Sequence, residues 1–102
     1  MTIAVLYRWT VKPGMEEQFR QGWVEGTRAI HEHCGSYGAR LHRNEDGVYV
    51  SYARWPDEET RQACSGKVDH SKDGFPEMRE ATEEFLGEEL LPVTDDLLDE
   101  PQ

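Results

Sequence analysis

Apolar and polar positions alternate strictly at the start of the chain, over residues 3–11. One face of this segment carries Ile3, Val5, Tyr7, Trp9 and Val11, and the other carries Ala4, Leu6, Arg8 and Thr10. A period of two residues is typical of a β-strand, because successive side chains point to opposite faces. Lys12-Pro13-Gly14 ends the alternation, so we expect a turn there.

A helical spacing of apolar residues follows. The pattern consists of Met15, Phe19, Trp23 and Ile30, which are four, four and seven residues apart. This spacing predicts an amphipathic helix over residues 15–33. Acidic residues begin this segment and histidines end it, in agreement with the helix dipole. Gly35 is placed to end the helix in a left-handed conformation.

A β-hairpin is predicted next, with strands at residues 37–43 and 48–55 joined by a turn that contains Asp46-Gly47. Val48, Val50 and Tyr52 fall on one face of the second strand, and Tyr49, Ala53 and Trp55 fall on the other. Since both faces carry large apolar groups, we expect helices to cover one side of the sheet and a second subunit to cover the other.

The second half of the chain is more polar. Asp57 is a good N-cap for a short helix over residues 57–64, and residues 65–74 predict an exposed loop. A further helix is expected from Phe75, with Met78, Ala81, Phe85 and Leu86 as its inner stripe. A last strand over residues 90–98 would contain Pro92, which suits the edge of a sheet. The predicted order is therefore βαββαβ.

Length and charge narrow the class of protein. A chain of 102 residues predicts a single domain, residues 1–102, with an acidic C-terminal tail at about residues 95–102. The net charge is −10, and residues 83–102 contain eight acidic side chains and no Lys or Arg. Such a chain would be repelled by phosphate groups, so we expect neither nucleic acid nor a membrane surface as a partner.

The two cysteines, Cys34 and Cys64, are read as isolated thiols rather than a disulfide framework. No signal peptide is recognised in the first residues, and no apolar stretch approaches the length of a membrane span. Together these observations predict a cytoplasmic protein.

The same segments resemble the antibiotic biosynthesis monooxygenase family. The resemblance lies in Ile3 to Trp9 with the following Val11-Lys12-Pro13-Gly14, in Gly35 to Arg43, and in Tyr52-Ala53-Arg54-Trp55-Pro56. It implies an α+β fold, a ferredoxin-like βαββαβ domain with an antiparallel sheet, that pairs as a homodimer into a dimeric α+β barrel. It also implies oxygen chemistry on an electron-rich aromatic molecule without a flavin, a metal or any other cofactor.

Such chemistry needs an apolar cavity, a proton acceptor and hydrogen-bond donors for the anion that forms. Tyr7, Trp9, Tyr52 and Trp55 are the candidates for binding the substrate, and their alternative is packing in the core or at the dimer interface. Candidates for catalysis are His42, Arg8 and Arg40. The arginines, Arg54 included, could instead form salt bridges, and His42 could be a surface residue.

Other chemistry is disfavoured. His31, His33 and Cys34 are the nearest approach to a metal-binding group, but residues two apart on a helix point to nearly opposite sides, so no metal site is expected. His70 lies in the polar loop and could act only if that loop folds over the cavity.

Two functions stay open. The first is a cofactor-independent monooxygenase that oxidises a small phenolic or polycyclic aromatic to a quinone. The second is a non-catalytic dimeric module that binds a small hydrophobic ligand.

Overall fold

The structure, a computed structural model, describes residues 2–98. Residues 99–102 of the predicted acidic tail lie outside this range. The elements are β1 (Ile3–Val11), α1 (Glu16–Cys34), β2 (Ala39–Arg43), β3 (Tyr49–Trp55), α2 (Glu58–Ala63), the short 3-10 helix η1 (Cys64–Gly66), α3 (Phe75–Ala81) and β4 (Thr82–Pro92). The fold is α+β and ferredoxin-like, as the sequence predicts.

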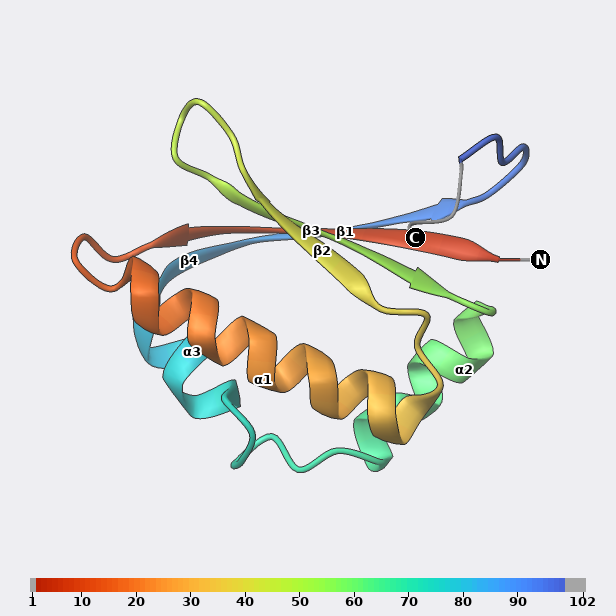
Figure 1. The fold of residues 1–102 in the computed structure, drawn as a ribbon, viewed down its shortest axis with the longest axis horizontal. Helices are drawn as coiled ribbons and strands as arrows, with labels where there is room; N and C mark the ends of the chain where they lie inside the picture. The colour runs from red at the N-terminus through yellow and green to blue at the C-terminus, as the bar shows by residue number, and fades with distance from the viewer. Residues whose placement is uncertain (1, 99–102) are drawn as a thin grey trace.

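The four strands form one antiparallel sheet in the order β2-β3-β1-β4. All the helices lie on the same side of this sheet, and its other side carries no helix within residues 2–98 (Figure 1). The two central strands, β1 and β3, therefore separate a face covered by helices from an open face.

Alternation along the central strands decides which residues face the helices. In β3, Tyr49, Ser51, Ala53 and Trp55 are buried and the residues between them are only half-buried. Val5 in β1 is fully buried on the same side. The face assignment that the sequence predicts for these two strands is thus confirmed.

The predicted start and end of the first helix are also confirmed. Met15 is the N-cap of α1, and Gly35 follows the helix with a φ of 75°, the left-handed conformation that glycine adopts without steric cost. Asp57 caps α2, where its side chain accepts a hydrogen bond of 2.7 Å from the amide of Thr60. The backbone and side-chain hydrogen bonds to Thr60 lower the pKa of Asp57.

The prediction for residues 82–98 was wrong in its boundaries. Phe85 and Leu86 belong to β4 rather than to a helix, and the strand ends at Pro92 instead of reaching Leu98. The strand begins earlier than predicted because it pairs with β1 along the whole stretch from Ile3 to Val11. β4 is an edge strand, so the position of Pro92 at its end costs no central hydrogen bond.

The interpretation of the cysteines as isolated thiols was wrong as well. Cys34 and Cys64 form a disulfide, with their Cα atoms 5.2 Å apart and a sequence separation of 30. The bond joins the end of α1 to η1, and both cysteines pack in the buried cluster that contains Val5 and Trp55. Pairing depends on how α2 and η1 fold back onto α1, which the spacing of two cysteines does not reveal.

Candidate functional site

A cavity of about 550 Å³ lies between the sheet and the helices. All four strands contribute to its sheet side, and α1, α3 and the loop before α3 supply the other walls. All three tryptophans of the chain, Trp9, Trp23 and Trp55, line it. A volume of this size suits a small organic molecule, and aromatic walls favour an apolar one.

Apolar residues and residues with a polar side-chain group contribute about equally to the rest of the wall. The wall includes Tyr7, Gly26, Thr27, Ile30, Ser36, Ala39, Ser51, Ala53, His70, Phe75, Met78, Arg79, Thr82 and Phe85. Such a site can exclude water from an aromatic ligand while a small number of hydrogen-bonding groups orient it.

Tyr7 connects the cavity wall to an ion-pair network. Its hydroxyl oxygen accepts a hydrogen bond of 3.1 Å from Nη1 of Arg61. Glu58 holds the same guanidinium through two hydrogen bonds of 2.6 and 2.8 Å, and Glu88 lies 2.8 Å from Nη1. Burial raises the pKa of Tyr7 despite the nearby Arg61, so its hydroxyl keeps its proton at neutral pH.

Ser51 and Trp23 form a second polar pair in the cavity wall. The indole Nε1–H of Trp23 on α1 donates to Oγ of Ser51 on β3 over 3.2 Å. Ser51 is only 2% exposed, so this bond spans from helix to sheet in the interior of the domain.

His70 reaches the cavity because the loop between η1 and α3 folds against the domain. Its ring lies 4.8 Å from the ring of Phe75, centroid to centroid, and Nη1 of Arg79 donates to its backbone oxygen over 2.9 Å. Both neighbours also line the cavity. The condition under which the sequence allows His70 to act, a loop folded over the cavity, is therefore met.

The structure divides the residues predicted from the sequence between the two faces of the sheet. Tyr7, Trp9 and Trp55 line the cavity. Tyr52 pairs with Leu6 in β1 and with Arg40 in β2, and residues directly opposite each other share a face. Tyr52 and Arg40 therefore lie on the open face.

Arg8 and His42 lie on the open face by the same argument, since each is opposite Val50. His42 is exposed, and its Nδ1 is 3.3 Å from the backbone oxygen of Val50. Arg8 forms a salt bridge of 3.7 Å with Glu89, and Arg54 forms one of 3.6 Å with Asp96. The structure thus does not bring His42, Arg8 and Arg40 into the cavity.

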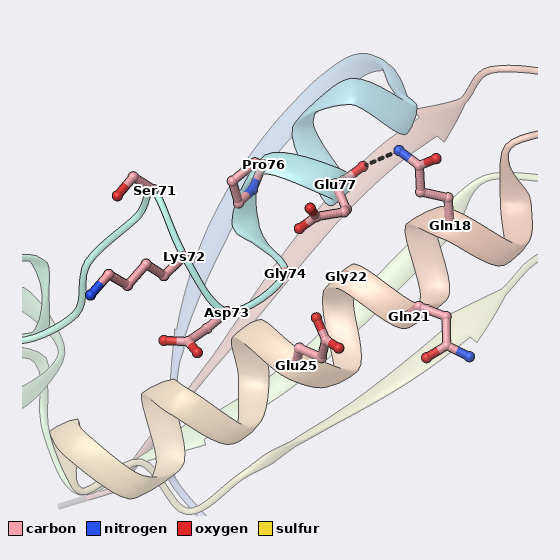
Figure 2. A pocket seen from close by; sticks show the side chains of 10 residues that line it. All are labelled: Gln18, Gln21, Gly22, Glu25, Ser71, Lys72, Asp73, Gly74, Pro76 and Glu77. Atoms are coloured by element: carbon pink, nitrogen blue, oxygen red, sulfur yellow. Dashed lines mark hydrogen bonds between the residues drawn. The ribbon is translucent and has the colours of Figure 1, made fainter.

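A second hollow, of about 450 Å³, lies where α1 meets the start of α3 (Figure 2). Its wall is polar, and Nε2 of Gln18 donates to the backbone oxygen of Glu77 across it over 3.0 Å. Figure 2 shows Gly22 of α1 beside Gly74, where the two backbones approach closely. This hollow lacks the aromatic walls of the first cavity.

Two further findings concern metals and membranes. Within residues 2–98, no group of three or more His, Cys, Asp or Glu side chains is arranged to hold a metal ion. No helix in that range is long and apolar enough to cross a membrane.

The sheet order and the helices on one side define an α+β, ferredoxin-like domain with an apolar cavity between its layers. The profile of the antibiotic biosynthesis monooxygenase family matches residues 2–74, and the chain belongs to this family. A comparison with curated protein sequences gives no match.

Solved structures share the fold at low sequence identity. SnoaB from Streptomyces nogalater, a cofactor-independent oxygenase, aligns with a TM-score of 0.72 and 17% identity over 96% of this chain and 98% of its own. A Caulobacter crescentus CB15 protein named for the same family gives a TM-score of 0.76 and 18% identity over 92% and 91% of the two chains. Rv0793 from Mycobacterium tuberculosis gives 0.71 and 14% over 96% and 100%. At these identities the likeness concerns the fold.

Proposed function

We propose that this protein is a cofactor-independent monooxygenase that oxidises a small phenolic or polycyclic aromatic to a quinone inside the cavity. The observation that carries the proposal is the cavity itself, about 550 Å³ in volume and lined by Trp9, Trp23 and Trp55. Membership of the family and the fold shared with a cofactor-independent oxygenase support it.

The reaction converts one aromatic molecule and one dioxygen into one quinone and one water. A base first removes a proton from the bound phenol or anthrone, and the resulting anion transfers an electron to dioxygen. The substrate radical and the superoxide combine into a carbon-bound hydroperoxide. Its O–O bond then breaks, and one oxygen atom stays in the substrate as the new carbonyl. The other oxygen leaves as water with the proton that the base removed and the remaining hydrogen of the oxidised carbon. Dry aromatic walls favour this sequence, because they protect the reactive anion from protonation by water.

His70 is the proton acceptor that this proposal places at the cavity. Imidazole is the general base most often used in enzymes, and His70 is the only histidine among the residues that line the cavity within residues 2–98. Tyr7, whose hydroxyl is protonated and fixed by Arg61, is a candidate donor to the oxygen of the anion. His42, Arg8 and Arg40 stay a prediction from the sequence, for a site on the open face.

Oxygen uptake tests the proposal. Purified protein without added flavin or metal is mixed with anthrones and naphthohydroquinones, and dioxygen consumption is followed with an electrode. We expect uptake well above the spontaneous rate and a loss of about 100-fold in kcat for His70→Gln, the size of a typical general-base contribution. His33→Gln, an exposed histidine on α1, is the matched control. Equal rates with and without protein across the panel would contradict the proposal.

The second candidate is a dimeric module that binds a small hydrophobic ligand without turnover. It is favoured by the placement of His42, Arg8 and Arg40, since none of these three predicted catalytic residues lines the cavity. An increase in melting temperature with aromatic ligands, without oxygen uptake, would support it.

Both candidates assume a homodimer formed through the open face of the sheet. Cytoplasmic localisation stays a prediction, and one of its premises, unpaired thiols, was wrong.

A further inference from the structure

We propose that the hydroxyl group of Ser51 is the anchor that selects ligands with an oxygen atom, by donating a hydrogen bond to that oxygen. The inference rests on the proposed function in one respect, namely that the cavity takes an aromatic molecule. It goes further by naming the contact that orients the molecule and the chemical feature that the molecule must carry.

A serine hydroxyl group can both donate and accept hydrogen bonds. A hydroxyl has one hydrogen to donate and two lone pairs that accept. The indole Nε1–H of Trp23 can only donate, so in the 3.2 Å bond the Oγ of Ser51 is the acceptor and uses one of its lone pairs. The hydrogen of the Ser51 hydroxyl is not used in this bond. Among residues 2–98, no protein group accepts a hydrogen bond from this hydroxyl. Its hydrogen is therefore available to a ligand in the cavity.

Burial makes that hydrogen important. Ser51 is 2% exposed and lines the cavity from the centre of the sheet, opposite Tyr7 in the neighbouring strand. A buried donor without an acceptor is destabilising, and a ligand oxygen can supply the acceptor. An apolar isostere would fill the same space but leave the donor unsatisfied, which is how a site rejects a molecule that lacks an oxygen.

Another serine in the same wall provides the contrast. Ser36 is 5% exposed and also lines the cavity. Its Oγ accepts from the amide of Gly38 over 2.9 Å and donates to the backbone oxygen of Arg54 over 3.5 Å. Because both capacities are used within the protein, Ser36 has no comparable hydrogen to offer. The two serines therefore differ in what they can give a ligand, although both are buried.

A pair of isosteric probes tests the inference by binding alone. 1-Naphthol and 1-methylnaphthalene differ by a hydroxyl in place of a methyl group, and 1-methoxynaphthalene offers an oxygen that only accepts. Dissociation constants are measured by calorimetry for the wild-type protein and for Ser51→Ala. The quantity compared is the ratio of the methylnaphthalene constant to the naphthol constant.

We expect Ser51→Ala to lower this ratio about tenfold, and to weaken 1-methoxynaphthalene by a similar factor, as the loss of one hydrogen bond predicts. Ser36→Ala should leave the ratio within a factor of two. Trp23→Phe, which frees the lone pair of Ser51 and lets the hydroxyl rotate, should lower the ratio by a smaller factor. Circular dichroism establishes whether each variant is folded. If Ser51→Ala is not folded, the ratio measured for Trp23→Phe tests the inference instead.

The outcomes separate this inference from the proposed function. An unchanged ratio in Ser51→Ala overturns the anchor, even if the wild-type protein consumes oxygen. A lowered ratio without any oxygen uptake supports the anchor and contradicts the monooxygenase. Failure of all three probes to bind the wild-type protein overturns the anchor, because the cavity then does not take oxygen-bearing bicyclic aromatics.

Discussion

Tyr7 is the residue at which the cavity wall meets the ion pairs outside it, and its titration should be visible in the stability of the protein. Burial raises its pKa above the ordinary value of 10.0. The folded protein therefore holds the phenol proton more tightly than the unfolded chain does. Stability from this group is complete below about pH 10 and is lost as the pH rises through the folded pKa. We expect Tyr7→Phe to lose stability less steeply between pH 9 and pH 11, as measured by urea unfolding.

At neutral pH the same variant should be less stable by about 1 kcal/mol, because the hydrogen bond from Arg61 is lost. Tyr37→Phe is the control, since that ring is 54% exposed. If the slopes of Tyr7→Phe and the wild type coincide above pH 9, burial of the Tyr7 hydroxyl does not perturb its titration.

Sequence reasoning found the residues whose position follows from local periodicity and missed those whose position follows from folding. Alternation put Tyr7 and Trp9 on one face of β1 and Trp55 on one face of β3, and in the structure all three line the cavity. It also put Tyr52 and Trp55 on opposite faces of β3, but it could not show which of these faces bounds the cavity, because the sequence does not reveal which face the helices cover. The buried bond between Ser51 and Trp23 joins residues 28 apart and leaves no local signal.

Helix α1 packs tightly against the start of α3 at Gly22 and Gly74, and this contact helps to position one cavity wall. A Cβ atom at Gly22 would lie 2.7 Å from the backbone oxygen of Gly74 and 2.8 Å from the amide nitrogen of Met78. Backbone atoms cannot yield as a flexible side chain can. We expect Gly22→Ala to reduce the free energy of unfolding by about 1–2 kcal/mol, since overpacking outweighs the gain in helix propensity.

Thermal unfolding followed by circular dichroism measures this loss, which corresponds to a fall of about 5–10 °C in Tm. Gly66→Ala is the matched control, because its φ is not in the left-handed region and a Cβ there meets nothing within 4 Å. A Gly22→Ala protein as stable as Gly66→Ala would mean that α1 and α3 can separate without cost.

The element that the sequence misassigned shows why local pattern was insufficient in the second half of the chain. Residues 82–90 are rich in Glu and Leu, which favour a helix, yet they form β4. Pairing with β1 overrides this preference, and Phe85 packs against Trp9 with ring centroids 5.9 Å apart. Gly87, with a φ of 107°, is a local sign that the helix could not continue.

At the scale of the whole molecule, the two faces of the sheet have different roles. One is covered by helices and bounds the cavity, and the other is left open within the described residues (Figure 1). Leu6, Val50 and Tyr52 share the open face, where each is half-buried in a single chain. A sheet with apolar groups on both faces generally packs against something on each side.

A second copy of the chain is the occupant that we expect on the open face. Light scattering after size exclusion should give a mass of twice 11.8 kDa for the wild type. Leu6→Lys places a charge at the centre of that face and should shift the protein to the mass of one chain, because an unpaired buried charge is costly. Ser65→Lys, at an exposed position in η1, should leave the mass unchanged. A wild-type protein with the mass of one chain would contradict the dimer.

The same measurement bears on the residues that the sequence proposed for catalysis. If two sheets pack face to face, Arg8, Arg40 and His42 lie at or near that interface, with Arg8 already bound to Glu89. His42→Ala would then change the dimer's stability more than its turnover, whereas His70→Gln would do the reverse. If His42→Ala instead abolished oxygen uptake in an intact dimer, the reacting aromatic would lie between the subunits and not among the three tryptophans.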